Sequence, residues 1–195
     1  MTEWIISDTH FGHHNIIKYC SRPFQSVNRM DATMILRWQE RVKPEDTIYH
    51  IGDVGLTKGD FLEKRILPCL PGKKILILGN HDKSAKRMME IGFDFACEGM
   101  FIRPAEWGSV LLFLSHKPLR TKPNFPGVGY PDYVLHGHIH NSTSEERAKH
   151  ESKGEIVEIP SFNINMSVEL WDYQPVSLVP LVKKRLWLDK PAKHA

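Results

Sequence analysis

The stretch Leu135-His136-Gly137-His138-Ile139-His140 continues an apolar run that begins at Tyr133, and it ends in residues that bind metals. Short runs rich in Ile, Val and Leu are typical of buried β-strands. Two histidines two positions apart at the end of such a strand rarely serve packing alone. The stretch therefore predicts a strand that delivers imidazoles to a site at its carboxyl end.

Four upstream stretches have the same construction. Apolar runs lead into Ser7-Asp8-Thr9-His10, Gly52-Asp53, Gly79-Asn80-His81-Asp82 and Ser115-His116. Asp8 and His10 would share one face if the extended backbone continued through them. Ligands of open α/β sheets bind just beyond the carboxyl ends of the strands. We therefore expect seven side chains to form a two-metal site at one rim: Asp8, His10, Asp53, Asn80, His116, His138, His140.

Length and composition indicate a globular chain. It has 195 residues, of which 41% are hydrophobic and 25% charged, and we expect one domain over residues 1–182 and a basic tail over 183–195. The net charge of +3 does not suggest a polybasic nucleic-acid binder. The three cysteines form no C-x-x-C pair, and we see neither a membrane span nor room for a signal peptide. These features predict a cytoplasmic location.

Periodicity predicts the remaining elements. Apolar residues recur at helical spacing from Ser26 to about Val42, which indicates an amphipathic helix. Shorter helices are expected after Asp60 and Ser84, either of which can cap a helix. Alternation of apolar and polar residues predicts further strands at 155–159 and 166–171, and another is possible at 176–182, whereas prolines and glycines indicate a loop at 123–131.

The ordered series of motifs resembles a known signature. Asp8-x-His10, Gly52-Asp53, Gly79-Asn80-His81-Asp82, His116 and Gly137-His138-x-His140 are similar, block by block, to the calcineurin-like metallophosphoesterase superfamily. Arg22-Pro23-Phe24 and Val168-Glu169-Leu170-Trp171 add a likeness to small phosphoesterases of bacteria and phages. The resemblance implies a four-layer αββα sandwich, in which helices flank two mixed β-sheets and a dinuclear metal site lies at the carboxyl ends of the strands.

One departure narrows the resemblance. Phosphoprotein phosphatases of the superfamily continue Gly-Asp into a further Asp-Arg-Gly and carry an Arg within Gly-Asn-His-Glu. Here the corresponding runs are Gly52-Asp53-Val54-Gly55-Leu56 and Asn80-His81-Asp82-Lys83. The sequence is therefore more similar to the branches that hydrolyse phosphodiesters.

The resemblance also implies the ligand sets. One metal would be held by Asp8, His10, Asp53 and His140, and the second by Asp53, Asn80, His116 and His138. Four imidazoles without a thiolate suit Mn, Fe, Ni, Co or Zn, with Mn favoured, and disfavour Ca and Mg. The implied reaction is hydrolysis of a phosphate ester by a hydroxide that bridges the two metals.

Other residues near the motifs have two possible roles each. By the resemblance, His81 protonates the leaving oxygen or stabilises the transition state. Asp82 would either orient His81 or cap the next helix. Arg22 would bind a substrate oxygen or form an exposed ion pair, and His13 would reach the substrate or lie exposed. We expect packed or hydrogen-bonded roles for two histidines in or beside strands: His50, His136.

The favoured function is hydrolysis of phosphodiesters of small or nucleotide substrates, with no membrane partner. The main alternative is a nuclease or RNA-end-processing enzyme, because basic residues cluster at Lys73-Lys74, Lys83-Lys86-Arg87 and Lys183-Lys184-Arg185. A phosphomonoesterase and a non-catalytic metal-binding scaffold are further alternatives. The scaffold is disfavoured because no ligand of the signature is missing.

Overall fold

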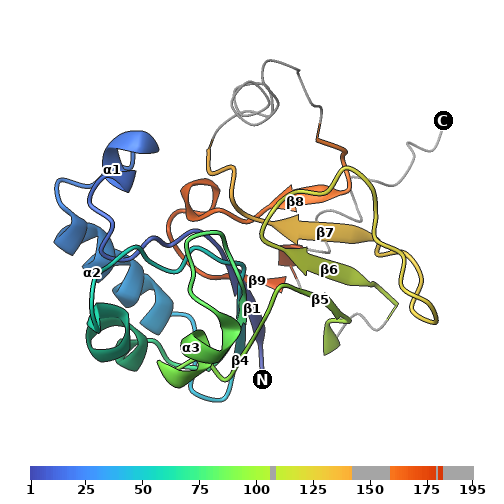
Figure 1. Cartoon of the computed structure of the whole chain (residues 1–195), viewed down its shortest axis with the longest axis horizontal. Coiled ribbons are helices and arrows are strands. Elements are labelled where there is room, and N and C mark those ends of the chain that lie inside the picture. The colour runs from blue at the N-terminus through green and yellow to red at the C-terminus, as the bar shows by residue number, and fades with distance from the viewer. Residues whose placement is uncertain (106–108, 142–158, 179, 182–195) are drawn as a thin grey trace.

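A computed structural model describes residues 1–105, 109–141, 159–178 and 180–181. Its strands form two mixed β-sheets, as predicted (Figure 1). The first sheet has the order β4 (Phe95–Cys97), β3 (Lys73–Ile77), β2 (Thr47–His50), β1 (Glu3–Ile6), β9 (Val176–Ser177). The second has the order β5 (Gly99–Ile102), β6 (Leu112–Ser115), β7 (Tyr133–His136), β8 (Asn163–Asn165). The β1–β9 and β5–β6 pairs are antiparallel, and the other neighbours are parallel.

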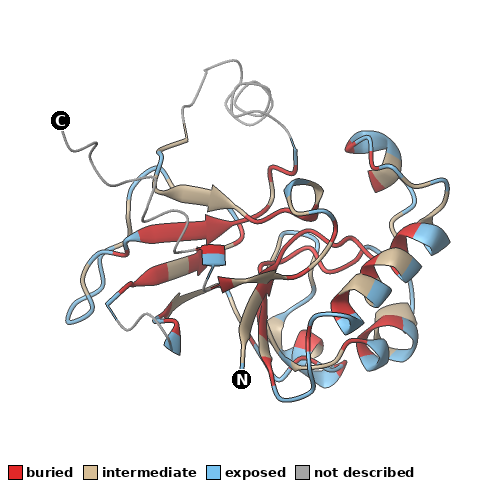
Figure 2. Cartoon of the chain, turned by 180° about the vertical axis from the view of Figure 1, so that it is seen from behind, coloured by how far each residue is buried: buried red, intermediate tan, exposed pale blue. Residues whose placement is uncertain are grey.

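The first sheet is buried on both faces because successive side chains of a strand point to opposite sides. In β1, Ile6 packs into a core shared with the helices, whereas Ile5 packs into a core shared with the second sheet. Ile48 and Tyr49 divide in the same way in β2. The buried colouring of Figure 2 follows these strands and the facing strands of the second sheet. This accounts for the continuous apolar runs in the sequence.

Helices cover the first sheet on the side away from the second (Figure 1). They are α1 (Ile16–Tyr19), α2 (Val27–Gln39), the π-helix η1 (Leu62–Ile66), the 3-10 helix η2 (Leu67–Cys69) and α3 (Ala85–Glu90). The predicted helix after Ser26 is confirmed as α2, and the Ser26 side chain accepts a hydrogen bond from the N–H of Arg29. Ser84 caps α3 in the same way, whereas the Asp60 side chain does not cap η1 and instead pairs with Lys64 at 2.6 Å.

The prediction of a strand at 166–171 is wrong. Residues Val168–Leu170 form a short 3-10 helix, η4, directly after β8. The Asn165 side-chain oxygen accepts hydrogen bonds from the backbone and hydroxyl of Ser167, and this turns the chain. The N–H of Val168 then bonds the carbonyl of Ser7 at 3.1 Å. These hydrogen bonds override the strand preference that the alternation of apolar and polar residues indicated.

Four other predictions have mixed outcomes. The possible strand at 176–182 is confined to β9, which ends at Ser177. The strand predicted at 155–159 and the basic tail at 183–195 fall almost wholly outside the described residues. The predicted loop at 123–131 is confirmed by a turn closed by an isolated bridge between Phe125 and Gly129, and Phe125 packs against Phe101 on the outer side of the second sheet, with ring centroids 5.4 Å apart.

The described residues thus give a layer of helices and two layers of sheet. Within them, the outer side of the second sheet is contacted by the segment 117–131, and a helical fourth layer stays a prediction. None of the helices in these described ranges is long and apolar enough to cross a bilayer.

Candidate metal centre

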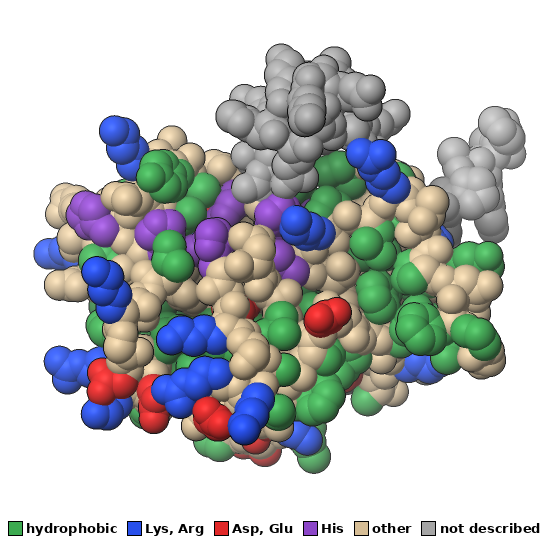
Figure 3. Space-filling model, in the orientation of Figure 1, with side chains coloured by type: hydrophobic (Ala, Val, Ile, Leu, Met, Phe, Trp, Pro, Cys, Tyr) green, Lys and Arg blue, Asp and Glu red, His purple; other side chains and the backbone are tan. Residues whose placement is uncertain are grey.

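The loops that follow five strands meet at one rim. These strands are β1, β2 and β3 of the first sheet and β6 and β7 of the second. Backbone hydrogen bonds tie neighbouring loops together, from Asp8 to Gly52 at 3.0 Å, from His10 to Asp53 at 3.0 Å and from Gly137 to His116 at 3.0 Å. Histidine side chains gather in one patch on this face (Figure 3). The predicted convergence of the strand ends is therefore observed.

The backbone reaches this rim in an unusual conformation. Five of the predicted ligands have positive φ angles, with values of 57°, 51°, 55°, 70° and 49° in the order Asp8, His10, Asp53, His138, His140. The extended backbone on which the shared face of Asp8 and His10 depended is therefore not present. Left-handed backbone in residues other than glycine costs about 1–3 kcal/mol each and clusters at functional sites. Tight turns, rather than strand alternation, aim these side chains inward.

Two glycines allow the loops to approach one another closely. A Cβ atom on Gly79 would overlap the carboxylate of Asp53. A Cβ atom on Gly137 would overlap the hydroxyl of Ser7 and the carboxylate of Asp8. Both motif positions therefore require glycine, because any side chain there would overlap a carboxylate.

The predicted ligands fall into two groups that could each hold a cation, and Cys20 and Glu169 form a third candidate group with His140. In the first, the ligand atoms of Asp8, His10 and His140 all lie within 4.8 Å of one another. In the second, the same holds for Asp53, His116 and His138. These groups reproduce six of the seven predicted ligands.

Asp53 stands between the two groups. Its Oδ2 atom lies 3.5 Å from His10 Nε2 and 3.5 Å from His116 Nε2. Its Oδ1 atom accepts a 2.9 Å hydrogen bond from the backbone N–H of His81, which leaves Oδ2 directed at the imidazoles. The seventh predicted ligand, Asn80, places its side-chain oxygen 3.1 Å from His116 Nε2.

Hydrogen bonds fix the imidazole tautomers in the form that binds cations. Nδ1 of His116 donates to the carbonyl of Ile51 at 2.8 Å, so Nε2, 3.5 Å from Asp53 Oδ2, is the nitrogen left for a cation or a proton. Nε2 of His10 is fully buried and has no hydrogen-bond partner among the described residues. An orphaned buried nitrogen is costly without a partner. Nitrogen and oxygen donors around a central carboxylate fit a pair of borderline divalent cations.

The electrostatics of the rim favour positive charge. Burial opposes ionisation of Asp53, but the hydrogen bonds and charge of His116 hold its pKa well below the usual range. Burial lowers the pKa of His10 to about 2, which leaves its ring neutral. Burial also acts against protonation of His140, yet bonds to Cys20 and Glu169 and the charge of Asp8 raise its pKa to about 10. The field that holds a proton there also favours a cation.

Sequence reasoning gave no role to Glu169, which lies beneath the first group. Its Oε1 atom accepts a 2.9 Å hydrogen bond from His140 Nδ1. The same atom accepts bonds of 2.9 and 2.7 Å from Nε and Nη2 of Arg22. The stretch Val168-Glu169-Leu170-Trp171 was the available signal, because a carboxylate there matched small phosphoesterases.

Arg22 forms an ion pair, as one of its two predicted roles has it, but the pair with Glu169 is buried rather than exposed. Arg22 is only 4% exposed, and a contact with substrate stays a prediction. Besides Glu169, its guanidinium bonds the carbonyls of Asp8 at 2.7 Å and Thr9 at 2.9 Å. Arg22 therefore secures the backbone that carries Asp8 and His10.

His81 and Asp82, which are adjacent in sequence, differ in position. The His81 side chain is 42% exposed, and its Nε2 lies 4.0 Å from Asp53 Oδ2. The Asp82 carboxylate instead accepts backbone hydrogen bonds from Asp53 at 2.8 Å, Val54 at 3.0 Å and Gly79 at 2.8 Å. Neither predicted role of Asp82 is supported, because it binds the loop of Asp53 rather than His81, and Ser84 caps α3. Its pKa is raised by burial.

His50 and His136 have the packed or hydrogen-bonded positions expected of them, whereas the role of His13 stays a prediction. His13 is half-buried at the edge of the first group, with Nδ1 3.4 Å from Nδ1 of His10. His50 is buried, and its Nε2 lies 2.9 Å from the hydroxyl of Thr9. That hydroxyl donates to the carbonyl of Val54, so Nε2 of His50 must be the donor to it. His136 is also buried and bonds the carbonyl of Gly137 at 2.8 Å.

Comparison with known proteins identifies the class. The profile of the calcineurin-like phosphoesterase superfamily domain matches residues 1–157. The chain therefore belongs to the calcineurin-like phosphoesterase superfamily. Members of this superfamily hydrolyse phosphate esters with divalent metals, so the chain is a metallophosphoesterase.

Individual relatives extend the likeness along most of the chain. The uncharacterized protein MJ1445 of Methanocaldococcus jannaschii is 35% identical over 182 residues, covering 92% of this chain and 89% of that protein. The gene 66 protein of Mycobacterium phage L5 is 37% identical over 81 residues, covering 40% of this chain and 39% of its own. The crystal structure of the protein of unknown function AQ665 from Aquifex aeolicus has a TM-score of 0.68 at 30% identity, covering 94% of this chain and 98% of that one.

Proposed function

We propose that the chain is a phosphodiesterase that acts on small or nucleotide substrates with two divalent cations, manganese being favoured. The observation that carries the proposal is the position of Asp53. One oxygen of its carboxylate lies 3.5 Å from an imidazole nitrogen of each ligand group. A carboxylate so placed is suited to two cations at once.

Two sets of side chains would hold the cations. The first set comprises Asp8, His10, Asp53, His140, and the second comprises Asp53, Asn80, His116, His138. Six of these residues form the two groups described above, and Asn80 contacts His116. When bound, two such cations activate water as a nucleophile and offset charge on the phosphoryl oxygens.

His81 is the proposed general acid. Its imidazole reaches the rim from the solvent side and is held beside Asp53 by the bond from its own backbone N–H. In that position Nε2 can deliver a proton to the leaving oxygen as the phosphorus–oxygen bond breaks. A positioned general acid contributes about 100- to 10,000-fold to the rate. His13, half-buried beside His10, is retained as a proposed substrate contact.

A diester is favoured over a monoester because of where Arg22 lies. A monoester carries an additional negative charge, for which an arginine is a common partner. Arg22 is the arginine that the sequence analysis proposed as a substrate contact. Its guanidinium is buried and bonds Glu169 and two backbone carbonyls. The position of Arg22 thus gives no support to a monoester specificity.

Small substrates are favoured over a nucleic acid for a similar reason. Lys73 and Lys74 lie at the start of β3, whereas the centre follows its end, and the Lys74 ammonium bonds the carbonyls of Leu70 and Gly72. Arg87 is paired with Glu63 at 2.8 Å and with Glu90 at 3.4 Å. The third basic cluster, 183–185, lies outside the described residues. Of the residues in the two described clusters, Lys83 lines the hollows beside the metal centre, whereas Lys74 and Arg87 are engaged elsewhere, so these clusters form no continuous basic stripe toward the metals.

The test compares bis(4-nitrophenyl) phosphate with 4-nitrophenyl phosphate, using the manganese-loaded protein. We expect a kcat/KM at least about tenfold higher for the diester and a loss of about 100-fold or more in Asp53→Ala. His81→Ala should impair a phenyl diester more than a nitrophenyl diester, because a poorer leaving group depends more on the proton. His14→Ala, at an exposed position, is the matched control.

Three results would overturn the proposal in different ways. Release no faster than a blank with metal alone would contradict phosphodiester hydrolysis. A higher rate with the monoester would replace the diesterase assignment with a phosphomonoesterase. Degradation of labelled oligonucleotides without turnover of either small ester would favour the nuclease.

A further inference from the structure

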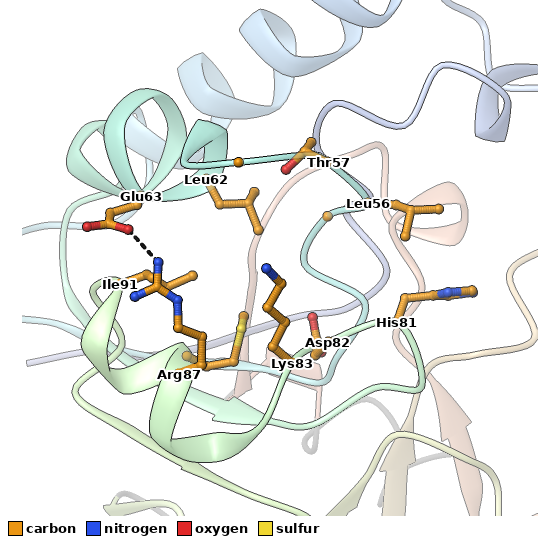
Figure 4. Close-up of a pocket in the computed structure, with 12 residues that line it drawn as sticks. Leu56, Thr57, Leu62, Glu63, His81, Asp82, Lys83, Arg87 and Ile91 are labelled. Atoms are coloured by element: carbon orange, nitrogen blue, oxygen red, sulfur yellow. Dashed lines mark hydrogen bonds and ion pairs between the residues drawn. The ribbon is translucent and has the colours of Figure 1, made fainter.

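A pocket adjoins the metal centre on the side of His81 (Figure 4). Its volume is about 110 Å³, and its apolar walls come from Leu56, Leu62, Met88 and Ile91. His81 and Lys83 also line it. An apolar cavity that holds benzene has about 150 Å³, so this smaller pocket takes at most one small ring.

Lys83 gives the pocket a positive charge. Figure 4 shows its side chain extending between the walls, toward Leu62 and Thr57. Among the residues that the structure describes, no carboxylate forms an ion pair with its ammonium, whereas Arg87 at the far wall is paired with Glu63 at 2.8 Å. The Asp82 carboxylate, which also lines the pocket, is directed to three backbone N–H groups. Lys83 is therefore available to a ligand.

The pocket and the metal centre share His81. His81 borders the pocket, and its imidazole, which Figure 4 shows turned away from Lys83, has Nε2 4.0 Å from Asp53 Oδ2. On the other side, an open cleft of about 500 Å³ is lined by Asn80 and His116, and again by Lys83. A substrate whose phosphorus lies at Asp53 thus has two places for its two ester groups. The group next to His81 is the one whose oxygen would receive the proton.

We propose that this pocket is the subsite for the leaving group, and that it takes a small alcohol of about one ring that carries an anionic substituent bound by Lys83. The inference rests on the proposed phosphodiesterase function and specifies its substrate class. Hydrolysis places the hydroxyl of water on phosphorus and the proton on the leaving oxygen, so the anionic alcohol departs through this pocket. The apolar walls contact the ring, and the ammonium pairs with the substituent.

The test uses three methyl aryl phosphodiesters with similar shapes and the full-length, metal-loaded protein. Their leaving groups are 4-carboxyphenol, 4-phosphonophenol and 4-carbamoylphenol, of which the last is neutral. We expect kcat/KM about tenfold higher for an anionic leaving group than for the neutral one, as a hydrogen bond to a charged group allows. Comparing kcat/KM for the 4-carboxyphenol ester with that for the 4-phosphonophenol ester shows whether a carboxylate or a phosphate-like group fits the pocket better.

Lys83→Gln should reduce this preference to about one. Lys86→Gln, an exposed lysine nearby that does not line the pocket, should retain it. Calorimetry with 4-hydroxybenzoate gives a second reading that does not depend on turnover, since the wild type should bind it more tightly than the Lys83→Gln protein by about tenfold.

The outcomes separate the two levels of the inference. Equal rates for all three esters, or a preference that survives in Lys83→Gln, would overturn the subsite and leave the phosphodiesterase intact. If the protein hydrolyses none of the three esters and also fails to hydrolyse bis(4-nitrophenyl) phosphate, both the subsite and the phosphodiesterase function are overturned.

Discussion

Glu169 fixes the orientation of His140, because its Oε1 accepts a 2.9 Å hydrogen bond from Nδ1 of that ring. The other ring nitrogen, Nε2, is thereby directed at Asp8, 3.7 Å from its Oδ1. Both partners are buried, with exposed side-chain fractions of 8% and 2%. A carboxylate in this position also increases the basicity of a histidine that binds a cation. The metal centre thus depends on a residue that lies outside the two ligand groups.

Glu169→Gln should weaken metal binding by about 10- to 100-fold, the usual effect of losing such a partner. The amide retains the shape but not the charge that orients and polarises His140. Titration of the metal-free protein with Mn²⁺ measures the affinity, and Glu45→Gln, at an exposed position, is the control. Unchanged affinity in Glu169→Gln would show that the bond to His140 has no part in the centre.

Arg22→Ala should lower the free energy of unfolding of the metal-free protein by about 3–5 kcal/mol, because it leaves the buried Glu169 charge without its partner. The Arg22–Glu169 pair is 2.7 Å long and almost fully buried. Urea unfolding measures the change, and the exposed Arg29→Ala should change stability by less than about 0.5 kcal/mol. If Arg22→Ala instead has normal stability and a raised KM, Arg22 binds the substrate rather than stabilising the fold.

Asp82→Asn should lower both stability and kcat while the pH dependence of kcat keeps its shape. Both carboxylate oxygens accept backbone N–H groups, and an amide would turn its own N–H₂ toward one of them. One lost acceptor for a buried donor costs about 1–3 kcal/mol. Thermal unfolding and a pH–rate profile measure the two effects. A shift of the profile's basic limb would show that Asp82 acts on His81 after all.

Asp31 provides a pH-dependent prediction away from the metal ligands. It is buried in α2 and accepts hydrogen bonds of 3.2 and 3.1 Å from the N–H of Gly12. Burial is the largest influence on this carboxyl and raises its pKa to about 6. The folded state therefore binds the proton more tightly than the unfolded state does. The ionised form costs stability above pH 6, and this cost disappears as the pH falls below the unfolded pKa of about 4.

Asp31→Asn should consequently stabilise the protein by about 2–3 kcal/mol at pH 8, since the amide can accept the Gly12 bond without carrying charge. The difference from the wild type should shrink between pH 6 and pH 4. Denaturant unfolding at several pH values measures it, and taking the difference between variants cancels the titration of other groups. A constant difference across this range would contradict a raised pKa.

The sequence predicted the parts of the molecule that are local in the chain. Each ligand cluster directly follows its own strand, so β1, β2, β3, β6 and β7 and their common rim could be inferred from short windows. The partnership of Arg22 with Glu169 spans 147 residues and leaves no periodic trace. The positive φ angles at Asp8 and His10 were likewise hidden, because tertiary contacts impose them. Alternation at 166–171 indicated a strand where side-chain bonds from Asn165 turn the chain.

The two ligand groups predict how many cations the protein binds. Wild-type protein should bind two per chain, and His116→Ala should bind about one, because it removes a member of the second group and leaves Asp8, His10 and His140 intact. Elemental analysis after dialysis against Mn²⁺ measures the number, with His14→Ala as control. Chelation should also lower the melting temperature of the wild type, since cations present at about 100 times their Kd add about 2.7 kcal/mol of stability. The stabilisation should be smaller in His116→Ala because one site is lost. One cation in the wild type, or two in the variant, would contradict a pair of sites that share Asp53.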